Sequence, residues 1–245
     1  MKRVPWKLTT GLILLATAVT ALKVKQAATA DVQITLPAGF KSETVTESLG
    51  NNRHLVVNSN GDVYVKLSKL KDGKGIFVLR KTDGKYKVIS SFGNYTGTGI
   101  AIKNGYLYAS SNTEVFRYKF NANNEIADPN NPEKIVTGLL SKGVHESKSI
   151  ALDDAGNIYV NIGAPSNACQ VTDRSAGSPG QDPCPILNNA GGLWQFKAGK
   201  LNQSYADGIR YATGLRNVVG LDWNSKESQL YLMQHGRDQL SQLYP

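Results

Sequence analysis

The feature that most constrains this fold is a strand–turn–strand pattern that occurs four times. Each copy has an apolar strand, a turn rich in Asn, Asp, Gly or Ser, and a second strand with a tyrosine near its centre. The copies are His54–Val65, Gly99–Tyr108, Ser149–Val160 and Val219–Leu232. Such a chain folds as a series of antiparallel hairpins, so the pattern predicts an all-β protein.

The spacing of the copies indicates how the hairpins are organised. Their tyrosines, Tyr64, Tyr108, Tyr159 and Tyr231, are separated by 44, 51 and 72 residues. The first two intervals are close to the length of a β-propeller blade, about 40 to 50 residues. Further strands are predicted at Gly75–Lys81, Tyr86–Ser90 and Val115–Phe120, which gives the four strands of a blade. A β-sandwich is the alternative, but it does not require this period.

Between three and a half and four repeats fit before Pro245. A propeller must close its ring to protect its edge strands. We therefore expect this chain to be the amino-terminal part of a longer propeller. The predicted organisation is a targeting segment at residues 1–30 and an incomplete propeller domain at residues 31–245.

The amino terminus has the features of a secretory signal. Met1–Lys7 is basic, Gly11–Leu22 is apolar, and Ala28–Ala30 fits a small-residue cleavage site. The apolar run is short for a membrane span, which needs about 20 residues. Lys23 and Lys25 follow it, so an uncleaved amino-terminal anchor remains the alternative. In both cases we expect the domain to be exported to the periplasm or the extracellular space. It would contact the membrane only through the possible anchor.

The positive charge is concentrated at the same end. The chain carries a formal net charge of +9, and residues 1–30 contain five Lys or Arg residues and no acidic residue. No Lys- or Arg-rich run follows residue 30, and no nucleic-acid-binding motif is present. We therefore expect no nucleic-acid partner.

The two cysteines, Cys169 and Cys184, lie in a segment rich in Pro and Gly from Ala164 to Gly191. In an exported protein they predict one disulfide, which by the chain-entropy model stabilises the fold by about 3 kcal/mol. A metal-binding pair is the alternative, but two further soft ligands are not apparent nearby. The segment follows the third hairpin, where it can wall a pocket or dock a partner.

Two polar clusters bracket the fourth hairpin. Tyr211–Asn217 precedes it with an Arg-Asn pair, and Gln234–Asp238 follows it. Two antiparallel strands joined by a short turn bring their outer ends together. We therefore expect both clusters at one rim of a sheet, where polar loops on a rigid scaffold form a site.

Several motifs along the chain jointly resemble one enzyme family. They are His145–Ser149 before the third hairpin, then Pro165–Asn167, Gly214–Asn217 and Gln234–Asp238. In this order they resemble the soluble glucose/sorbosone dehydrogenases and related pyranose dehydrogenases, from about residue 45 onward. The resemblance implies a six-bladed β-propeller that uses pyrroloquinoline quinone (PQQ) and calcium.

The resemblance also implies roles for individual residues. His145 matches the general base, for which an unperturbed pKa near 6.5 is suitable. Arg216 and Asn217 match a pair that contacts PQQ, and a guanidinium stabilises developing oxyanion charge. Gly236 and Arg237 match positions whose backbone carbonyls bind calcium, an ion that prefers oxygen ligands. The structural alternatives are a strand-edge histidine, a salt bridge and a turn cap.

The function implied by the resemblance is sugar oxidation. An aldose or pyranose would lose a hydride to PQQ, and an external acceptor, a cytochrome or a quinone, would take the electrons. The sequence departs from the family at Val144 and Ala164, where some members carry acids, and at Asn94–Gly99, where sugar-oxidising members carry a Gly-rich Gln loop. These departures concern sugar specificity more than cofactor use.

Two other function classes remain open. Six-bladed propellers also include calcium-dependent lactonases and esterases, in which carboxylates and Asn surround a central metal. A non-catalytic ligand-binding propeller is the third possibility, because a fold alone does not determine function.

Overall fold

The computed structural model describes residues 34–240. It divides into a first unit that ends at Glu43 and a second that begins at Thr44. Residues 34–43 form no helix or strand and contain one turn, in which the Phe40 N–H donates to the Pro37 carbonyl over 3.2 Å. The predicted signal or anchor at residues 1–30 lies outside the described residues. None of the helices between residues 34 and 240 is long and apolar enough to cross a membrane.

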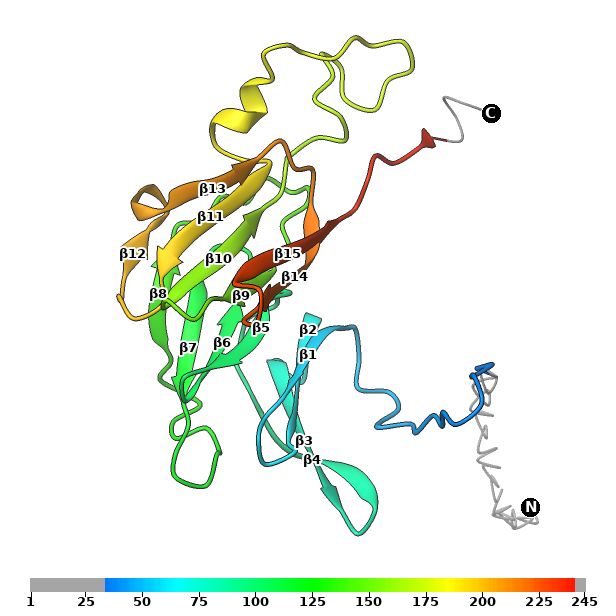
Figure 1. Cartoon of the computed structure of the whole chain (residues 1–245), viewed down its shortest axis with the longest axis vertical. Helices are drawn as coiled ribbons and strands as arrows, with labels where there is room; N and C mark the ends of the chain where they lie inside the picture. The colour runs from blue at the N-terminus through cyan, green and yellow to red at the C-terminus, as the bar shows by residue number, and fades with distance from the viewer. Residues whose placement is uncertain (1–33, 241–245) are drawn as a thin grey trace, which may run out of the picture. The chain divides into compact units, whose positions relative to one another are not determined.

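The second unit consists of consecutive antiparallel sheets (Figure 1). The first sheet contains β1 (Asn52–Val57), β2 (Val63–Lys71), β3 (Lys74–Thr82) and β4 (Lys85–Phe92). The second contains β5 (Ile100–Lys103), β6 (Tyr106–Ser110), β7 (Val115–Lys119) and β8 (Glu133–Thr137). The third contains β9 (Ile150–Leu152), β10 (Asn157–Ile162), β11 (Gly192–Lys197) and β13 (Ile209–Thr213). A final hairpin pairs β14 (Val218–Asn224) with β15 (Gln229–Gln234).

Each of the four predicted hairpins is present. The pairs β1–β2, β5–β6, β9–β10 and β14–β15 are all antiparallel, and the strands predicted between them form β3, β4 and β7. The all-β prediction is therefore confirmed. One strand crosses between sheets: β12 (Gln203–Ser204), which lies in sequence between β11 and β13, pairs in parallel with β8 of the second sheet.

Two hydrophobic clusters lie between successive sheets. One cluster joins the first and second sheets through residues such as Ile76 and Leu107. Another joins the second and third through residues such as Ile135 and Ile158. The middle sheet therefore packs on both of its faces, which distinguishes the fold from a two-sheet sandwich. Every residue of β10, in the third sheet, is buried, because this strand lies between β9 and β11 and also contacts β14 of the final hairpin.

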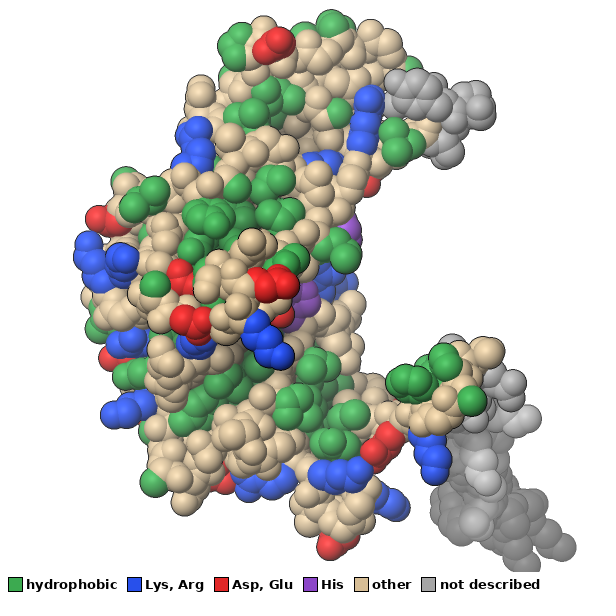
Figure 2. Space-filling view, viewed as in Figure 1, with side chains coloured by type: hydrophobic (Ala, Val, Ile, Leu, Met, Phe, Trp, Pro, Cys, Tyr) green, Lys and Arg blue, Asp and Glu red, His purple; other side chains and the backbone are tan. Residues whose placement is uncertain are grey.

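The repeated tyrosines show the same packing. Tyr64, Tyr108 and Tyr159 are 1–3% exposed and lie inside the sheet stack. Tyr231, at the equivalent position of the final hairpin, is 51% exposed. The surface around β13 and β15 also exposes Ile209, Leu232 and Met233. On the face drawn in Figure 2, Lys and Arg side chains are interspersed with Asp and Glu.

The first strands of the sheets converge. Strands β1 and β5, β5 and β9, and β9 and β14 are in contact. Residues from all four strands line a cavity of about 350 Å³, including His54, Ile102, Ala151 and Asp222. Loops at one end of this central cavity form the candidate site.

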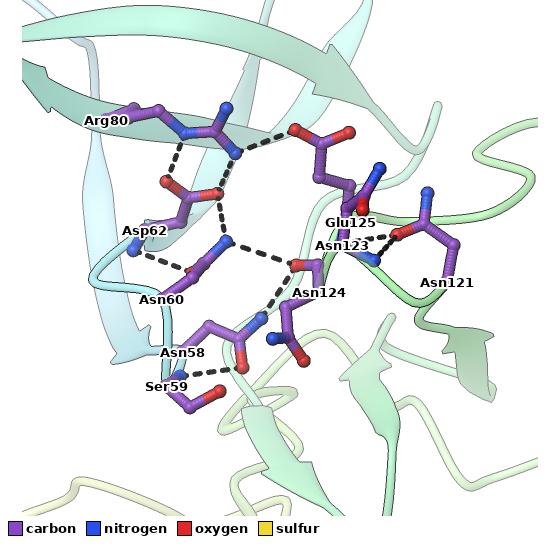
Figure 3. Close-up of polar contacts among 9 residues, drawn as sticks. All are labelled: Asn58, Ser59, Asn60, Asp62, Arg80, Asn121, Asn123, Asn124 and Glu125. Atoms are coloured by element: carbon purple, nitrogen blue, oxygen red, sulfur yellow. Dashed lines mark hydrogen bonds and ion pairs between the residues drawn. The ribbon is translucent and has the colours of Figure 1, made fainter.

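A polar network joins the first two sheets at the opposite end (Figure 3). Asp62 is fully buried, and it accepts hydrogen bonds from Arg80 Nε and Nη2, each at 2.7 Å. Arg80 also donates to Glu125 of the second sheet over 2.8 Å. The side chains of Asn58 and Asn60 donate to the Asn124 carbonyl. The network fixes the β1–β2 turn against the β7–β8 segment.

Replacing Asp62 with alanine is expected to destabilise the protein by about 2 kcal/mol, because two charge-assisted hydrogen bonds to Arg80 are lost. Glu125→Gln is the matched control. The Glu125 side chain is 45% exposed, and exposed ion pairs contribute less than about 1 kcal/mol. Urea unfolding of both variants measures the difference. Equal losses would show that burial of Asp62 does not determine the strength of this contact.

Candidate active site

The candidate site lies in loops at one rim of the sheets. A cavity of about 400 Å³ is lined by residues from three loops that lead into β5, β9 and β14, with further residues from the first two sheets. His145 and Asn217 both line it, together with Ser68, Thr96, Thr98, Asn112, Glu146 and Ser147. The structure thus brings together two of the sequence-predicted residues, in a pocket of mainly hydroxyl, amide and carboxylate groups.

His145 is held by its backbone and by one hydrogen bond. Its φ of 52° lies in the left-handed region, which is uncommon for a residue other than glycine. The imidazole is partly buried, and Nδ1 lies 2.6 Å from the Ala164 carbonyl oxygen. Because a carbonyl only accepts, Nδ1 carries the proton in this contact and Nε2 is the basic nitrogen.

The surroundings of His145 keep its imidazole neutral. Burial is the largest effect that lowers its pKa below 6.5, and the positive charges of Arg216 and Arg174 act in the same direction. The Ala164 carbonyl and the Asp238 carboxylate oppose these effects. With a lowered pKa, the imidazole can accept a proton at neutral pH.

Gly163 determines how closely the third sheet approaches His145. A Cβ at Gly163 would lie 2.4 Å from the His145 carbonyl oxygen and 2.6 Å from the His145 Cβ. It would also lie 3.1 Å from Asn217 Oδ1. The absence of a side chain at Gly163 therefore allows two walls of the cavity to meet.

Asn217 is fixed by a second amide, Asn161, which the sequence reasoning did not identify. Asn161 is fully buried in β10. Its Nδ2 donates to Asn217 Oδ1 over 3.1 Å and to the Ser147 carbonyl over 2.9 Å, and its Oδ1 accepts from the Val218 N–H. The signal for this residue was a polar side chain inside the apolar run Ile158–Ile162.

Arg216 lies in a different part of the rim. Its side chain is 10% exposed and donates to three oxygens. They are the Asn167 carbonyl at 3.1 Å, the His235 carbonyl at 3.4 Å and Asp238 Oδ2 at 2.6 Å. It borders a cleft of about 200 Å³ that Cys169 and Cys184 also line, rather than the cavity that contains His145. The salt-bridge alternative for Arg216 is therefore present in the structure.

Gly236 and Arg237 lie in the segment that follows β15. A Cβ built at Gly236 meets no atom within 4 Å, so this residue faces open space. The backbone carbonyls of the pair are hard oxygen donors of the type that calcium prefers, but calcium needs six to eight such ligands. Within residues 34–240, no group of three or more His, Cys, Asp or Glu side chains is placed to hold a metal. These two carbonyls would thus supply part of a calcium site.

The predicted disulfide is confirmed, because Cys169 and Cys184 are bonded with their Cα atoms 6.2 Å apart. The metal-pair alternative is therefore wrong. The cysteine loop, residues 163–191, rises above the rim between β10 and β11 (Figure 1). It borders Arg216 in the cleft of about 200 Å³, as expected for a segment that walls a pocket.

Two buried lysines support the rim loops, and the sequence reasoning missed both. Lys66 Nζ donates to the Tyr95 carbonyl over 2.7 Å, and Lys148 Nζ donates to the Glu146 carbonyl over the same distance. Burial lowers the pKa of Lys66 to about 7 and that of Lys148 to about 8. Each lysine ties a buried strand or strand end to a loop that lines the 400 Å³ cavity.

These lysines predict that stability rises with pH. Above about pH 7 the folded protein releases their protons, whereas lysines in the unfolded chain hold them until about pH 10.4. The unfolded state then binds more protons, so the free energy of unfolding increases from pH 7 to 9. Denaturant unfolding should show this increase, and Lys66→Met should reduce it. Lys69→Met, an exposed control on the same strand, should leave it unchanged, and an equal effect of both variants would contradict the account.

Together, the successive sheets of four or five strands and the polar cavity at their convergent end define an all-β protein with a propeller-like fold. The chain belongs to the TrAA12-like family, whose model matches residues 34–244. The resemblance to PQQ-dependent sugar dehydrogenases is therefore confirmed. A search of curated proteins gives no match.

Solved structures show the same fold. The PQQ domain of pyranose dehydrogenase from Coprinopsis cinerea, in its holo form, matches with a TM-score of 0.62 and 16% identity over 79% of this chain and 46% of that chain. An AA12 enzyme from Trichoderma reesei matches with a TM-score of 0.63 and 20% identity over 86% and 53%. A Thermus thermophilus oxidoreductase described as a glucose dehydrogenase has a TM-score of 0.53 and 16% identity over 80% and 60%. The chain thus spans about half of the length of these structures.

Proposed function

We propose that this protein is an exported quinoprotein that oxidises an aldose or pyranose sugar with PQQ and calcium. The observation that carries the proposal is His145, whose Nδ1 is engaged by the Ala164 carbonyl while its imidazole lines a polar cavity. Membership of the TrAA12-like family supports the same chemistry. A structure of the Trichoderma enzyme with calcium supports the choice of metal.

In the proposed reaction, a sugar carbinol or hemiacetal carbon loses two electrons and two protons. His145 Nε2 takes the hydroxyl proton as the C–H hydride leaves, so the carbon becomes a carbonyl. Bound PQQ supplies the hydride acceptor, and calcium supplies electrostatic polarisation of that acceptor. An external acceptor, a cytochrome or a quinone, would take the two electrons.

The other residues of the rim have supporting roles in this proposal. Asn217 would contact the cofactor from the wall of the 400 Å³ cavity, and Arg216, from the neighbouring cleft, would stabilise developing negative charge. The carbonyls of Gly236 and Arg237 supply part of the calcium ligand set. Thr96, Thr98 and Glu146 offer hydroxyl and carboxylate groups that suit the hydroxyls of a sugar.

We also propose the organisation of the whole protein. Residues 31–245, with their three sheets and final hairpin, would form the first blades of a six-bladed propeller. Residues 1–30 would form a signal peptide or an amino-terminal anchor. The exposed apolar side chains on β13 and β15 support packing of a further sheet there. The Cys169–Cys184 disulfide supports export, because disulfides persist in oxidising compartments.

The test is reconstitution of the full-length protein with calcium and PQQ, followed by dye reduction with a panel of aldoses. PQQ uptake at micromolar concentration and sugar-dependent dye reduction are expected. Failure to bind PQQ under these conditions would overturn the proposal. Hydrolysis of a lactone or ester panel with calcium alone would favour the lactonase class instead.

A further inference from the structure

Asn167, in the cysteine loop, holds the segment that follows β15. It is 3% exposed. Its Oδ1 accepts from the Asp238 N–H over 2.9 Å, and its Nδ2 donates to the Asp238 carbonyl over 3.2 Å. This paired contact resembles one rung of a β-ladder and fixes both the position and the orientation of the Asp238 backbone.

The same residue holds Arg216. The Asn167 carbonyl accepts from Arg216 Nε over 3.1 Å, while Arg216 Nη2 contacts Asp238 Oδ2 over 2.6 Å. Three residues from separate parts of the sequence thus contact one another in a closed set. The Asn167 side chain therefore holds Asp238 directly, and its backbone carbonyl holds Arg216, so a shift of Asn167 would change both contacts.

The cysteine loop fixes Asn167 in turn. The Asn167 N–H donates to Asp173 Oδ1 over 2.8 Å, and the Cys169 N–H donates to Ser166 Oγ over 3.0 Å. Arg174 also reaches from the loop to Asp238 over 2.9 Å. The Cys169–Cys184 disulfide closes the segment that contains these contacts.

The backbone carbonyls of Gly236 and Arg237 lie between two residues, His235 and Asp238, whose backbones are held by hydrogen bonds. At one end the His235 N–H donates to the Asn217 carbonyl over 2.9 Å, and at the other end Asn167 holds Asp238. Gly236, between them, faces open space. The Gly236 and Arg237 carbonyls thus lie in a short segment that is held at both ends.

We propose that Asn167 is a positioning residue through which the cysteine loop fixes Arg216 and the Gly236–Arg237 carbonyls for cofactor binding. The inference rests on the proposed function, which assigns those groups to calcium and PQQ. Removing a residue that orients a metal ligand without touching the metal typically lowers metal affinity by 10- to 100-fold. Asn167 acts on the cofactor through the backbone and Arg216, without contacting it.

The test compares Asn167→Ala with the wild type in the full-length protein, using two readouts. Hydrogen exchange without cofactor should show faster exchange of the Asp238 amide by about tenfold, as expected when one hydrogen bond is lost. Calorimetric titration of calcium in the presence of PQQ should show an affinity lower by roughly 10- to 100-fold.

Ser178→Ala is the matched control within the same loop. Ser178 Oγ accepts from the Thr172 N–H over 2.9 Å, so this variant loses a contact inside the loop and none to Arg216 or Asp238. It should leave both readouts near the wild-type values.

The two readouts separate the inference from the proposed function. Unchanged exchange at Asp238, or faster exchange with unchanged calcium affinity, would contradict the positioning role. Loss of calcium affinity in Ser178→Ala equal to that in Asn167→Ala would contradict it as well. A wild-type protein that binds neither calcium nor PQQ would overturn the proposed function, and with it the cofactor part of the inference.

Discussion

His145→Ala is expected to lower kcat by about 10²- to 10⁴-fold, the usual contribution of a positioned general base. The substitution removes the imidazole from the wall of the 400 Å³ cavity. It should leave PQQ and calcium affinity close to the wild-type values, because His145 is not among the residues proposed to bind either group. The effect is therefore a loss of turnover with retained cofactor.

The pH dependence of kcat/KM provides a second test of the role of His145. Burial lowers the pKa of His145 below 6.5, so kcat/KM of the wild type should rise with pH below 6.5 and level off above it. Steady-state dye reduction from pH 4.5 to 8 measures the profile, and the acidic limb should be absent in His145→Ala. His54→Ala, on β1 in the separate central cavity, should retain the wild-type profile. Unchanged turnover in His145→Ala would remove the residue from the mechanism.

Gly163→Ala is expected to have the second largest effect, a loss of kcat of about 10²-fold with a lower stability. The added methyl group would meet the His145 backbone 2.4 Å away, and a backbone cannot rotate aside as a side chain can. The loop that carries His145 must therefore move. A displacement of about 1 Å of a reacting group can cost about 10²-fold in rate.

Gly199→Ala is the control for this prediction. Nothing lies within 4 Å of a Cβ built at Gly199, and its φ is outside the left-handed region. Turnover and urea unfolding of both alanine variants give the comparison. If Gly163→Ala retains full activity and stability, the close approach at His145 does not matter for the site.

Much of the fold could be predicted from the sequence because the repeat is local. The alternation of apolar strands and Asn- or Gly-rich turns identified the hairpins, and the period indicated four strands per sheet. The β12 strand could not be predicted in the same way. It is only two residues long, and its partners in β8, Val136 and Thr137, lie 67 residues earlier, so nothing local in the sequence indicates the pairing.

The parts of the candidate site that could be predicted are those whose residue type alone suggests a chemical role. A lone histidine before a hairpin, an Arg-Asn pair and two cysteines stand out in a sequence. The residues that hold them do not. Asn161 and Lys66 occupy strand positions that would suit an apolar residue, and only the folded structure shows which carbonyls and amides they reach.

The partners of Arg216 show the same limit. Its match to a cofactor-binding motif gave no indication that Asp238 and the Asn167 carbonyl would engage the guanidinium. Asp238 follows in the same polar cluster, but the contact depends on how the cysteine loop folds back. A long irregular loop carries little periodic signal from which its path could be derived.

The measurement that tests the account most directly is single-turnover reduction of PQQ bound to the full-length, calcium-loaded protein. An aldose is mixed with the loaded protein, and the PQQ absorbance is followed in the wild type and in His145→Ala. We expect equal PQQ occupancy in both and reduction that is at least about 10²-fold slower in the variant. Equal reduction rates, or no PQQ uptake by the wild type, would contradict it.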